Sequence, residues 1–169
     1  MKARLMLLAL LGLVACASYN GRGLRLGIDG YAQVIQLMGT PSMQWDSPDG
    51  SRQLAFARGP AGYDTYMVFI GADGLLQKKE NVLNREHFIL ITPGMDKEDV
   101  LRIIGPSQPA WTAYFERRDE LVWEWRYCDD WHEASRFDVL FDNTSSKVRT
   151  TYSITESQKG MCGRGKCSC

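Results

Sequence analysis

A short segment occurs twice in this chain, and this repeat constrains the fold more than any other feature of the sequence. The stretch VIQLMGTPSMQW begins at Val34, and the related stretch VLRIIGPSQPAW begins at Val100. An alignment without gaps places three pairs opposite each other: Met38 and Ile104, Gly39 and Gly105, Trp45 and Trp111. A repeat of this kind indicates one structural unit that is built twice in tandem.

Each copy predicts a short amphipathic helix. In DKEDVLRIIG the apolar residues Val100, Leu101 and Ile104 share one helical face, and DGYAQVIQLMG repeats the pattern. Asp29 and Asp96 stand where an N-cap is expected, because a carboxylate there accepts hydrogen bonds from the free N–H groups of the first turn. Helices this short are marginal alone, so each must pack its apolar face on another element.

A glycine and a proline follow each predicted helix. They form a helix-end motif of Gly39 and Pro41 in the first copy, and of Gly105 and Pro106 in the second. Helices often end at a glycine in the left-handed conformation, and we expect this of both glycines. The tryptophan that follows in each copy is expected to open a sheet.

Runs of alternating apolar and polar residues, separated by turn signals such as PDG and ADG, follow each helix. The first helix is followed by RQLAFAR, DTYMVFIG and LLQKKE, and the second by AWTAYFE, ELVWEWRY, RFDVLF and KVRTTYSI. In ELVWEWRY the residues Trp123, Trp125 and Tyr127 fall on one face of a strand. We therefore expect each helix to pack on an antiparallel meander that has one buried face.

The predicted fold class is α+β, with two tandem units of short helices packed on an antiparallel β-meander. A further short helix is expected before the second repeat, with Asn84 as its cap and with Phe88 and Ile91 packing inward. The expected boundaries are residues 1–15 for a signal peptide, 16–27 for a lipidated cysteine and flexible tether, 28–82 and 83–156 for the two units, and 157–169 for a flexible cysteine-rich tail.

The N-terminus resembles the signal peptide of a bacterial lipoprotein. Lys2 and Arg4 begin the chain, and the apolar run LMLLALLGLVA is too short for a comfortable transmembrane helix. The stretch LVAC, which ends at Cys16, resembles a lipobox, and the resemblance implies that Cys16 carries acyl chains such as palmitate. Ala17 follows Cys16. In such lipoproteins an Asp at this position favours the inner membrane, so the resemblance implies that a chain with Ala17 lies at the outer membrane and that its domain faces the periplasm. The mature chain is then anchored to a membrane without spanning it.

Several motifs together resemble a known family. They are the lipobox, G-[IM]-D, a helix that ends in MGTP or IGPSQP, the aromatic strand VWEWRY and the final FDVLF hairpin. This succession resembles the SmpA/OmlA group of small outer-membrane lipoproteins, to which BamE of the barrel-assembly machinery belongs. The resemblance covers the mature chain up to about Ile154, as two copies where BamE proteins carry one, and the tandem layout is also similar to the β-lactamase inhibitory protein fold. It implies a protein-binding scaffold, with the outer-membrane barrel-assembly machinery as a partner.

Four cysteines remain beyond the lipobox: Cys128, Cys162, Cys167 and Cys169. An even number of thiols in an oxidising compartment favours disulfides. A bond from Cys128 to one tail cysteine would clip the tail to the second unit and contribute about 3 to 4 kcal/mol in the chain-entropy model, whereas Cys167 and Cys169 are too close in sequence to pair easily. A disulfide or an unpaired flexible tail is the interpretation that we adopt, and the alternative is a soft metal ion such as Cu(I) or Zn(II) held by the tail thiolates.

Candidate catalytic groups are scarce. The histidines are His87 and His132, and no serine or cysteine lies in a G-x-S-x-G elbow. The segment YCDDWHE groups four residues that could bind a divalent metal: Asp129, Asp130, His132 and Glu133. Asp also favours hairpin tips, and a solvated hairpin loop is the interpretation that we adopt. The sequence therefore predicts a protein that is not an enzyme and that has no cofactor beyond the covalent lipid on Cys16.

The charge balance and the aromatic residues bear on the partner. The formal net charge is +0, from 20 basic and 20 acidic residues, which provides no electrostatic attraction for nucleic acid. Aromatic residues, which are frequent at protein interfaces, gather in the second unit at Trp111, Tyr114, Phe115, Trp123, Trp125 and Tyr127. The alternation assigns the last three to the core, so their outward neighbours on the same strand are the expected interface.

These observations predict a periplasmic lipoprotein of the outer membrane that acts as a non-enzymatic protein-binding scaffold, as an accessory of outer-membrane protein assembly or of envelope integrity. Two alternatives stay open. One is an inhibitor-like or stress module that binds a soluble periplasmic protein, and the other is a thiol-based metal-binding protein that uses the C-terminal cysteines.

Overall fold

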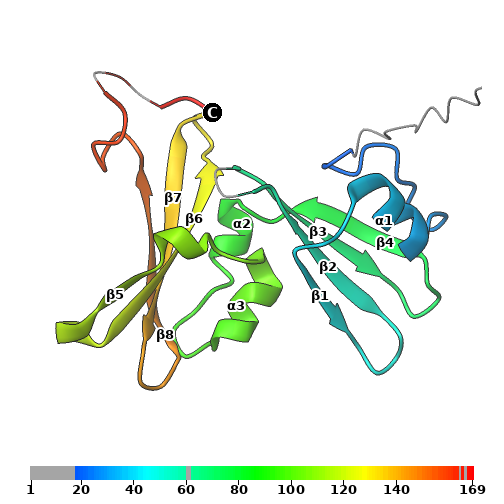
Figure 1. Cartoon of the computed structure of the whole chain (residues 1–169), viewed down its shortest axis with the longest axis horizontal. Coiled ribbons are helices and arrows are strands. Elements are labelled where there is room, and N and C mark those ends of the chain that lie inside the picture. Colours follow the sequence, from blue (N-terminus) through cyan, green and yellow to red (C-terminus); the bar gives the residue numbers. More distant parts are fainter. Residues whose placement is uncertain (1–17, 60–61, 164, 166) are drawn as a thin grey trace, which may run out of the picture.

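Two four-stranded antiparallel sheets and a few short helices make up an α+β fold (Figure 1). The computed structural model describes residues 18–59, 62–163, 165 and 167–169. The predicted signal peptide and Cys16 lie outside the described residues. Within the described part of the chain, no helix has the length and apolar character needed to cross a bilayer.

The strands of each sheet follow one another in chain order. The first unit contains α1 (Tyr31–Met38), β1 (Met43–Asp46), β2 (Arg52–Ala57), β3 (Thr65–Ile70) and β4 (Leu76–Asn81). The second contains α2 (Arg85–Phe88), α3 (Lys97–Ile104), β5 (Ala113–Phe115), β6 (Glu120–Cys128), β7 (Ala134–Asp142) and β8 (Val148–Thr155), with 3-10 helices η1 (Pro109–Trp111) and η2 (Glu116–Arg118).

Matching contacts tie the start of one helix to the start of the last strand in each unit. Gly30 precedes α1 and forms an antiparallel bridge to Leu75, and Asp96 precedes α3 and forms the same bridge to Lys147. The pairing of the last two strands is shifted by a bulge near this point in both sheets. The two halves of the chain therefore repeat one local architecture.

The helix α1 covers one face of the first sheet. Its residues Val34 and Met38 pack in a cluster with Leu54, Phe56 and Val68 of β2 and β3. The alternation along the strands places these residues on the side of the sheet that faces α1.

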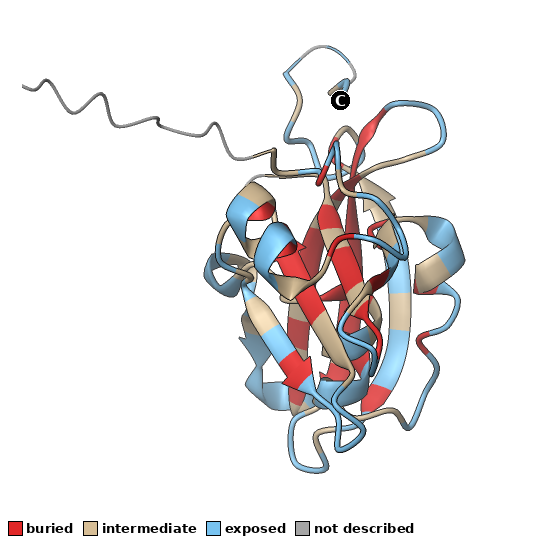
Figure 2. Cartoon of the chain, turned by 90° about the vertical axis from the view of Figure 1, so that its right-hand side faces the viewer, coloured by how far each residue is buried: buried red, intermediate tan, exposed pale blue. Residues whose placement is uncertain are grey.

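The other face of the first sheet packs against α3 and, through α3, against the second sheet. One cluster contains Trp45, Ala55 and Met67 of the first sheet, Val100 and Ile104 of α3, and Trp125, Phe137 and Val139 of the second sheet. The helices α2 and α3 lie between the two sheets (Figure 1), and buried residues concentrate on the inner strands (Figure 2). The expectation of one buried face is therefore wrong for the first sheet, because helices cover both of its faces.

The expected N-cap is present in the second repeat only. Asp96 accepts a hydrogen bond from the Asp99 N–H at 2.9 Å, and the Asp99 carboxylate accepts one from the Asp96 N–H at 3.0 Å. Asp29 is not a cap, because Gly30 takes that position and the Asp29 carboxylate binds Arg25, with an N–O distance of 2.8 Å. Asn84 caps α2 as expected, accepting from the His87 N–H.

Both helix-end glycines have positive φ, but they are not in the left-handed helical region. Gly39 has φ 85° and ψ −157°, and Gly105 has φ 74° and ψ −170°. The prediction of positive φ is confirmed, and the prediction of left-handed helical geometry is wrong. With ψ near 180° the chain leaves the helix extended toward the sheet, a conformation that is essentially restricted to glycine.

The tryptophans of the two repeats lie in different elements. Trp45 is in β1, as expected for a residue that opens the sheet. Trp111 ends the helix η1 instead, because Pro109 starts a helical turn that Gln108 caps, and the strand β5 begins only at Ala113.

Candidate functional site

The cysteines beyond Cys16 form two disulfides. Cys128 at the end of β6 is bonded to Cys169, and Cys162 is bonded to Cys167, with Cα–Cα distances of 5.8 and 5.4 Å. The first bond is of the kind expected from the sequence, between Cys128 and a tail cysteine. It closes the longer loop, with a sequence separation of 41.

The described part of the tail is tied to the second sheet. The Ala134 N–H donates to the Cys167 carbonyl at 2.7 Å, and the Cys169 N–H donates to the His132 carbonyl at 3.2 Å. Glu133 and Ser168 form an antiparallel bridge. The described tail residues are thus held against the β6–β7 hairpin by backbone hydrogen bonds as well as by the Cys128–Cys169 bond.

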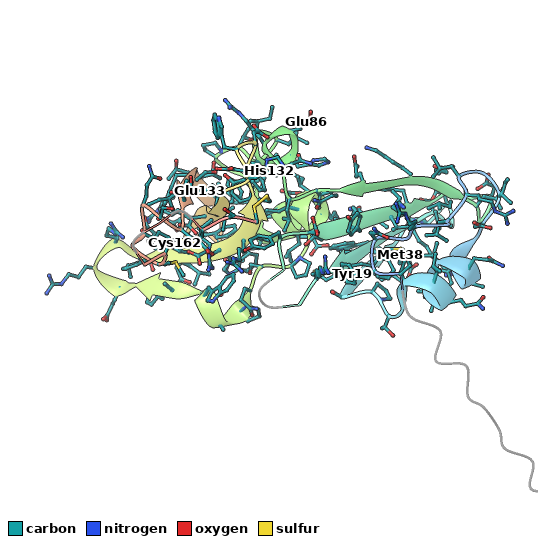
Figure 3. The ribbon with its side chains drawn as sticks, turned by 90° about the horizontal axis from the view of Figure 1, so that it is seen from above. Tyr19, Met38, Glu86, His132, Glu133 and Cys162 are labelled. Atoms are coloured by element: carbon teal, nitrogen blue, oxygen red, sulfur yellow. A yellow bond between two sulfur atoms is a disulfide. The ribbon has the colours of Figure 1, made fainter. Side chains whose placement is uncertain are left out.

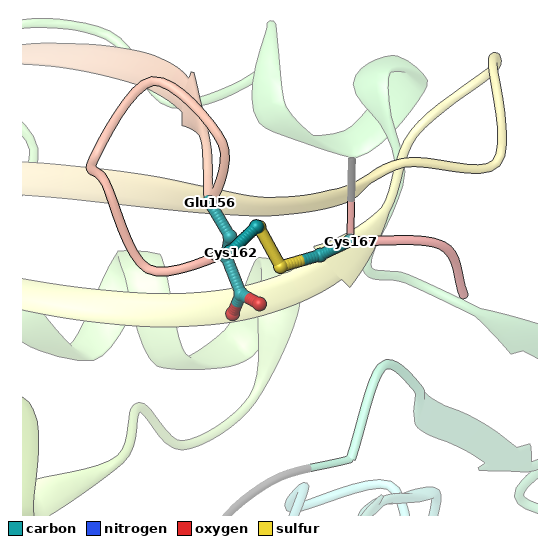
Figure 4. A group of neighbouring side chains, drawn as sticks. All are labelled: Glu156, Cys162 and Cys167. Atoms are coloured by element: carbon teal, nitrogen blue, oxygen red, sulfur yellow. A yellow bond between two sulfur atoms is a disulfide. The ribbon is translucent and has the colours of Figure 1, made fainter. Parts of the chain in front are cut away.

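One group of side chains in the tail has the donor atoms of a metal site. The donor atoms of Glu156, Cys162 and Cys167 lie within 4.8 Å of one another (Figure 4). The two sulfurs are joined in a disulfide, and the Glu156 carboxylate binds Arg126 and Arg136. A metal would need thiolates and a free carboxylate, so the observed state of these three residues does not suit one.

The face of the second sheet opposite α3 carries a network of charged side chains. Arg126 and Arg136 bind the same oxygen of Glu156, with N–O distances of 2.6 and 2.7 Å. Arg136 also binds Glu124 at 2.8 Å, and Lys159 of the tail pairs with the other oxygen of Glu124. Buried charges are stable only when they are paired in this way.

The residues of β6 on the face opposite Trp123, Trp125 and Tyr127 were expected to form an interface. This expectation is wrong. Val122 and Glu124 are both buried. Aromatic rings cover the two arginines, since the Trp111 ring lies 3.8 Å from the guanidinium carbon of Arg136, and the Tyr63 ring 4.3 Å from that of Arg126. On the opposite face of β6 the expectation is confirmed, because Trp125 and Tyr127 are buried in the core and Trp123 packs against it.

Asp138 lies beside the network on β7 and is 1% exposed. Burial is the main reason that its pKa rises to about 6, and the nearby Glu124 carboxylate also raises it. A hydrogen bond with Tyr152 and the charge of Lys159 act in the opposite direction. The Asp138 carboxyl is buried among other side chains of the fold, so its protonation affects the stability of the folded chain.

The last five residues of the segment YCDDWHE, 129–133, form the loop between β6 and β7. The Asp129 carboxylate accepts from the N–H groups of Trp131 and Glu133, both at 2.9 Å, and from the Ser135 hydroxyl at 3.2 Å. These bonds make Asp129 the organising residue of a hairpin loop. The hairpin interpretation is confirmed.

A cleft of about 640 Å³ lies between α2, this loop and β8. The Phe88 ring stacks on Phe137 with the ring centroids 3.9 Å apart, and it meets Tyr127 edge-on at 4.8 Å. Ile89, which follows α2, and Trp131, in the loop, both line the cleft and are 68% and 79% exposed. Figure 3 labels Glu86 of α2 and His132 of the β6–β7 loop, which belong to two of the elements that border the cleft.

The sequence contains a signal for this cleft that strand alternation and helical periodicity do not capture. The run Phe88-Ile-Leu-Ile91 has four apolar residues in a row, and a short helix cannot turn all of them toward one core. Phe88 and Ile91 are buried, which leaves Ile89 and Leu90 exposed. Trp131 is likewise a large apolar residue within a polar loop.

No protein-family model matches the chain, and no curated protein and no solved structure shows detectable similarity to it.

Proposed function

We propose that this chain is a lipid-anchored protein of the outer membrane that faces the periplasm and binds another protein through the cleft between α2, the β6–β7 loop and β8. The observation that carries the proposal is the exposed apolar rim of this cleft, formed by Ile89 and Trp131. Exposed apolar side chains gathered around a hollow mark interaction sites, and Trp is enriched among the residues that contribute most to binding.

The proposed location rests on the N-terminal sequence and on the cysteines. The lipobox-like LVAC at Cys16, with Ala17 after it, supports an outer-membrane anchor. The two disulfides support an oxidising compartment such as the periplasm.

The proposed scaffold is a tandem pair of BamE-like units of the SmpA/OmlA kind. The repeated bridges at Gly30 and Asp96 and the repeated bulges before the last strand support the duplication of one unit. The barrel-assembly machinery is therefore the partner to test first.

The proposal assigns no catalytic step to the chain. The ring of His87 lies between Asn84 and Glu80, with Nδ1 2.8 Å from Asn84 Oδ1 and Nε2 3.5 Å from Glu80 Oε2. These contacts fix the turn between β4 and α2, which is a structural role.

The test is site-specific photocrosslinking in intact cells, followed by separation of the inner and outer membranes. A crosslinking residue at position 131 should give a discrete adduct in the outer-membrane fraction, and one at Asp73, in the β3–β4 turn of the other unit, should give none. Cys16→Ser should release the protein from the membrane. Adducts with barrel-assembly subunits would support the family proposal, and adducts with a soluble periplasmic protein would support the inhibitor-like alternative.

If positions 131 and 73 give the same adducts or none, the cleft is not a protein-binding site and the proposal is wrong. If Cys16→Ser leaves the chain in the membrane fraction, the lipid anchor is wrong.

A further inference from the structure

The cleft runs along the free edge of the second sheet. β8 is the last strand in the order β5-β6-β7-β8, so one of its edges has no neighbouring strand. Five consecutive residues, 151–155, line the cleft. Successive side chains of a strand point to opposite faces, so a cleft that touches all five must also border the main chain at the strand edge.

The hydrogen bonds around β8 identify which main-chain groups point away from the sheet. The Glu156 N–H donates to the Ala134 carbonyl at 2.8 Å, toward β7. Because this direction alternates along an antiparallel strand, residues 150, 152 and 154 also face β7. Residues 151, 153 and 155 face outward.

Both ends of this edge are already paired. At one end Val148 bonds with Gly94 and Met95, at 2.9 and 2.8 Å. At the other end the Thr155 N–H donates to the Gln158 side chain, and the Thr155 carbonyl accepts from the Lys159 N–H. Between these ends, no hydrogen bond within the described chain is recorded for the outward main-chain groups of Thr151 and Ser153.

The equivalent edge in the first unit carries charged side chains, and the Lys79 ammonium there donates to the Asn20 and Gly21 carbonyls, both at 2.9 Å. Lys79 of β4 corresponds to Thr151, since both follow the bulge of the last strand by the same number of residues. The segment Lys78–Asn81 carries three charged side chains, whereas the segment Thr150–Ile154 carries none. Charged side chains, lysine above all, prevent the addition of another strand at a sheet edge. The edge of β8 lacks this protection.

We propose that the edge of β8 binds a short, extended, uncharged segment of a partner protein as an added strand, with one apolar side chain of that segment in the cleft. Main-chain donors and acceptors at Thr151 and Ser153 would pair with the segment, and Phe88, Ile89 and Trp131 would contact its apolar side chain. Arg85 and Asp130 both line the cleft with opposite charges, which favours a neutral occupant. This inference rests on the proposed protein-binding function and specifies its mode.

The first variant pair separates the main chain of the edge from its side chain. Ser153→Pro removes an outward N–H, and proline is tolerated on an edge strand when its nitrogen faces away from the ladder. Ser153→Ala keeps the N–H. The probe is the blocked pentapeptide Ac-Thr-Val-Phe-Val-Thr-NH2, followed by NMR titration through the amide resonance of Thr151, which both variants keep. We expect Ser153→Pro to weaken binding about tenfold, a factor that corresponds to about 1.4 kcal/mol and to about one lost hydrogen bond. Ser153→Ala should leave the affinity within about twofold.

A second comparison stays informative if Ser153→Pro fails to fold. The same peptide with N-methyl groups on alternate residues cannot pair along one edge, and it should bind the wild-type chain about tenfold more weakly than the parent. Thr151→Lys, which copies Lys79 of the first unit, should have a similar effect. Equal affinities for the methylated and parent peptides would overturn the strand-addition proposal.

Further measurements distinguish self-association of the chain, failure of strand addition and failure of the proposed protein-binding function. If the peptide does not bind but the wild-type chain dimerises in sedimentation and Ser153→Pro does not, the occupant is a second copy and the proposed partner is wrong. If the adducts at position 131 in cells persist in Ser153→Pro, the protein-binding function stands and strand addition is wrong. If those adducts are absent from the wild type, the proposed function itself has failed.

Discussion

Gly105 connects the end of α3 to both sheets. A Cβ at this position would lie 2.8 Å from Cγ2 of Thr65 in β3. The Gly105 carbonyl accepts a hydrogen bond from the Trp125 indole at 3.2 Å. Gly39 has a similar backbone conformation at the end of α1, but no atom would lie within 4 Å of its Cβ. The two repeat glycines therefore differ in packing, while they share a backbone conformation that would be strained for any residue with a Cβ.

Replacing each glycine by alanine should separate these two effects. Gly39→Ala should destabilise the protein by about 1 to 2 kcal/mol through backbone strain alone. Gly105→Ala should cost about 3 kcal/mol or more, because the clash with Thr65 is added to the strain. Urea unfolding of both variants measures the difference. Thr65→Ser removes the clashing methyl group and should recover part of the loss in Gly105→Ala but none in Gly39→Ala. Equal losses in the two variants would contradict the packing role.

Asp138 should make stability depend on pH. Its pKa is about 6 in the folded chain against an ordinary value of 3.8, so the folded state binds the proton more tightly than the unfolded state does. The stabilising effect of this proton is present at low pH and is lost as the pH rises through 6. Glu124, Tyr152 and Lys159 are the titratable groups that face Asp138.

The comparison of the wild type with Asp138→Asn isolates this group, because the other carboxylates are common to both proteins. Between pH 4 and pH 7 the wild type should lose about 2 kcal/mol of unfolding free energy relative to Asp138→Asn. Urea unfolding across this interval measures the difference. A difference that is constant with pH would show that Asp138 has the same pKa in the folded and unfolded states.

Elements with strong local signals were predictable, and those that depend on remote contacts were not. The strands β6, β7 and β8 and the helix α3 follow from alternation, from periodicity and from the Asp96 cap. The start of α1 was misplaced because Arg25 binds the Asp29 carboxylate, and the pattern of the helix does not reveal that contact. In the candidate site, the pairing of Cys128 with a tail cysteine was anticipated, but the cleft was missed because three separate segments form it.

The disulfide that closes the longer loop should stabilise the second unit more, because the loop-closure entropy rises with the logarithm of loop length. Replacing Cys128 and Cys169 together by serine should cost about 4 kcal/mol in the chain-entropy model, because the bond closes the longer loop. The matched replacement of Cys162 and Cys167, with a sequence separation of 5, should cost about 2 kcal/mol. Non-reducing urea unfolding of the two double variants tests the order. A larger loss from Cys162 and Cys167 would show that native contacts of the tail outweigh loop closure.

At the scale of the whole molecule, the two units share one core. The Trp45 indole donates to the Glu98 carboxylate, and the Gln53 side chain donates to the Arg102 carbonyl at 2.5 Å, so the first sheet binds α3 by polar as well as apolar contacts. Because α3 is buried against both sheets, neither sheet can lose it without exposing its own apolar face. The repeat in the sequence predicted two units, but it carried no information about the surface between them.

The shared core predicts that the units unfold together. Val34→Ala, which alters only the cluster between α1 and the first sheet, should lower the unfolding free energy by about 2 kcal/mol. If unfolding is cooperative, hydrogen exchange should report this loss at slowly exchanging amides of β7 as well as of β3. Val100→Ala in α3, a matched deletion in the shared cluster, should lower protection in both sheets in the same way. If Val34→Ala accelerates exchange in β3 and leaves β7 unchanged, the units unfold independently, and the packing of α3 on the first sheet adds little to the stability of the second.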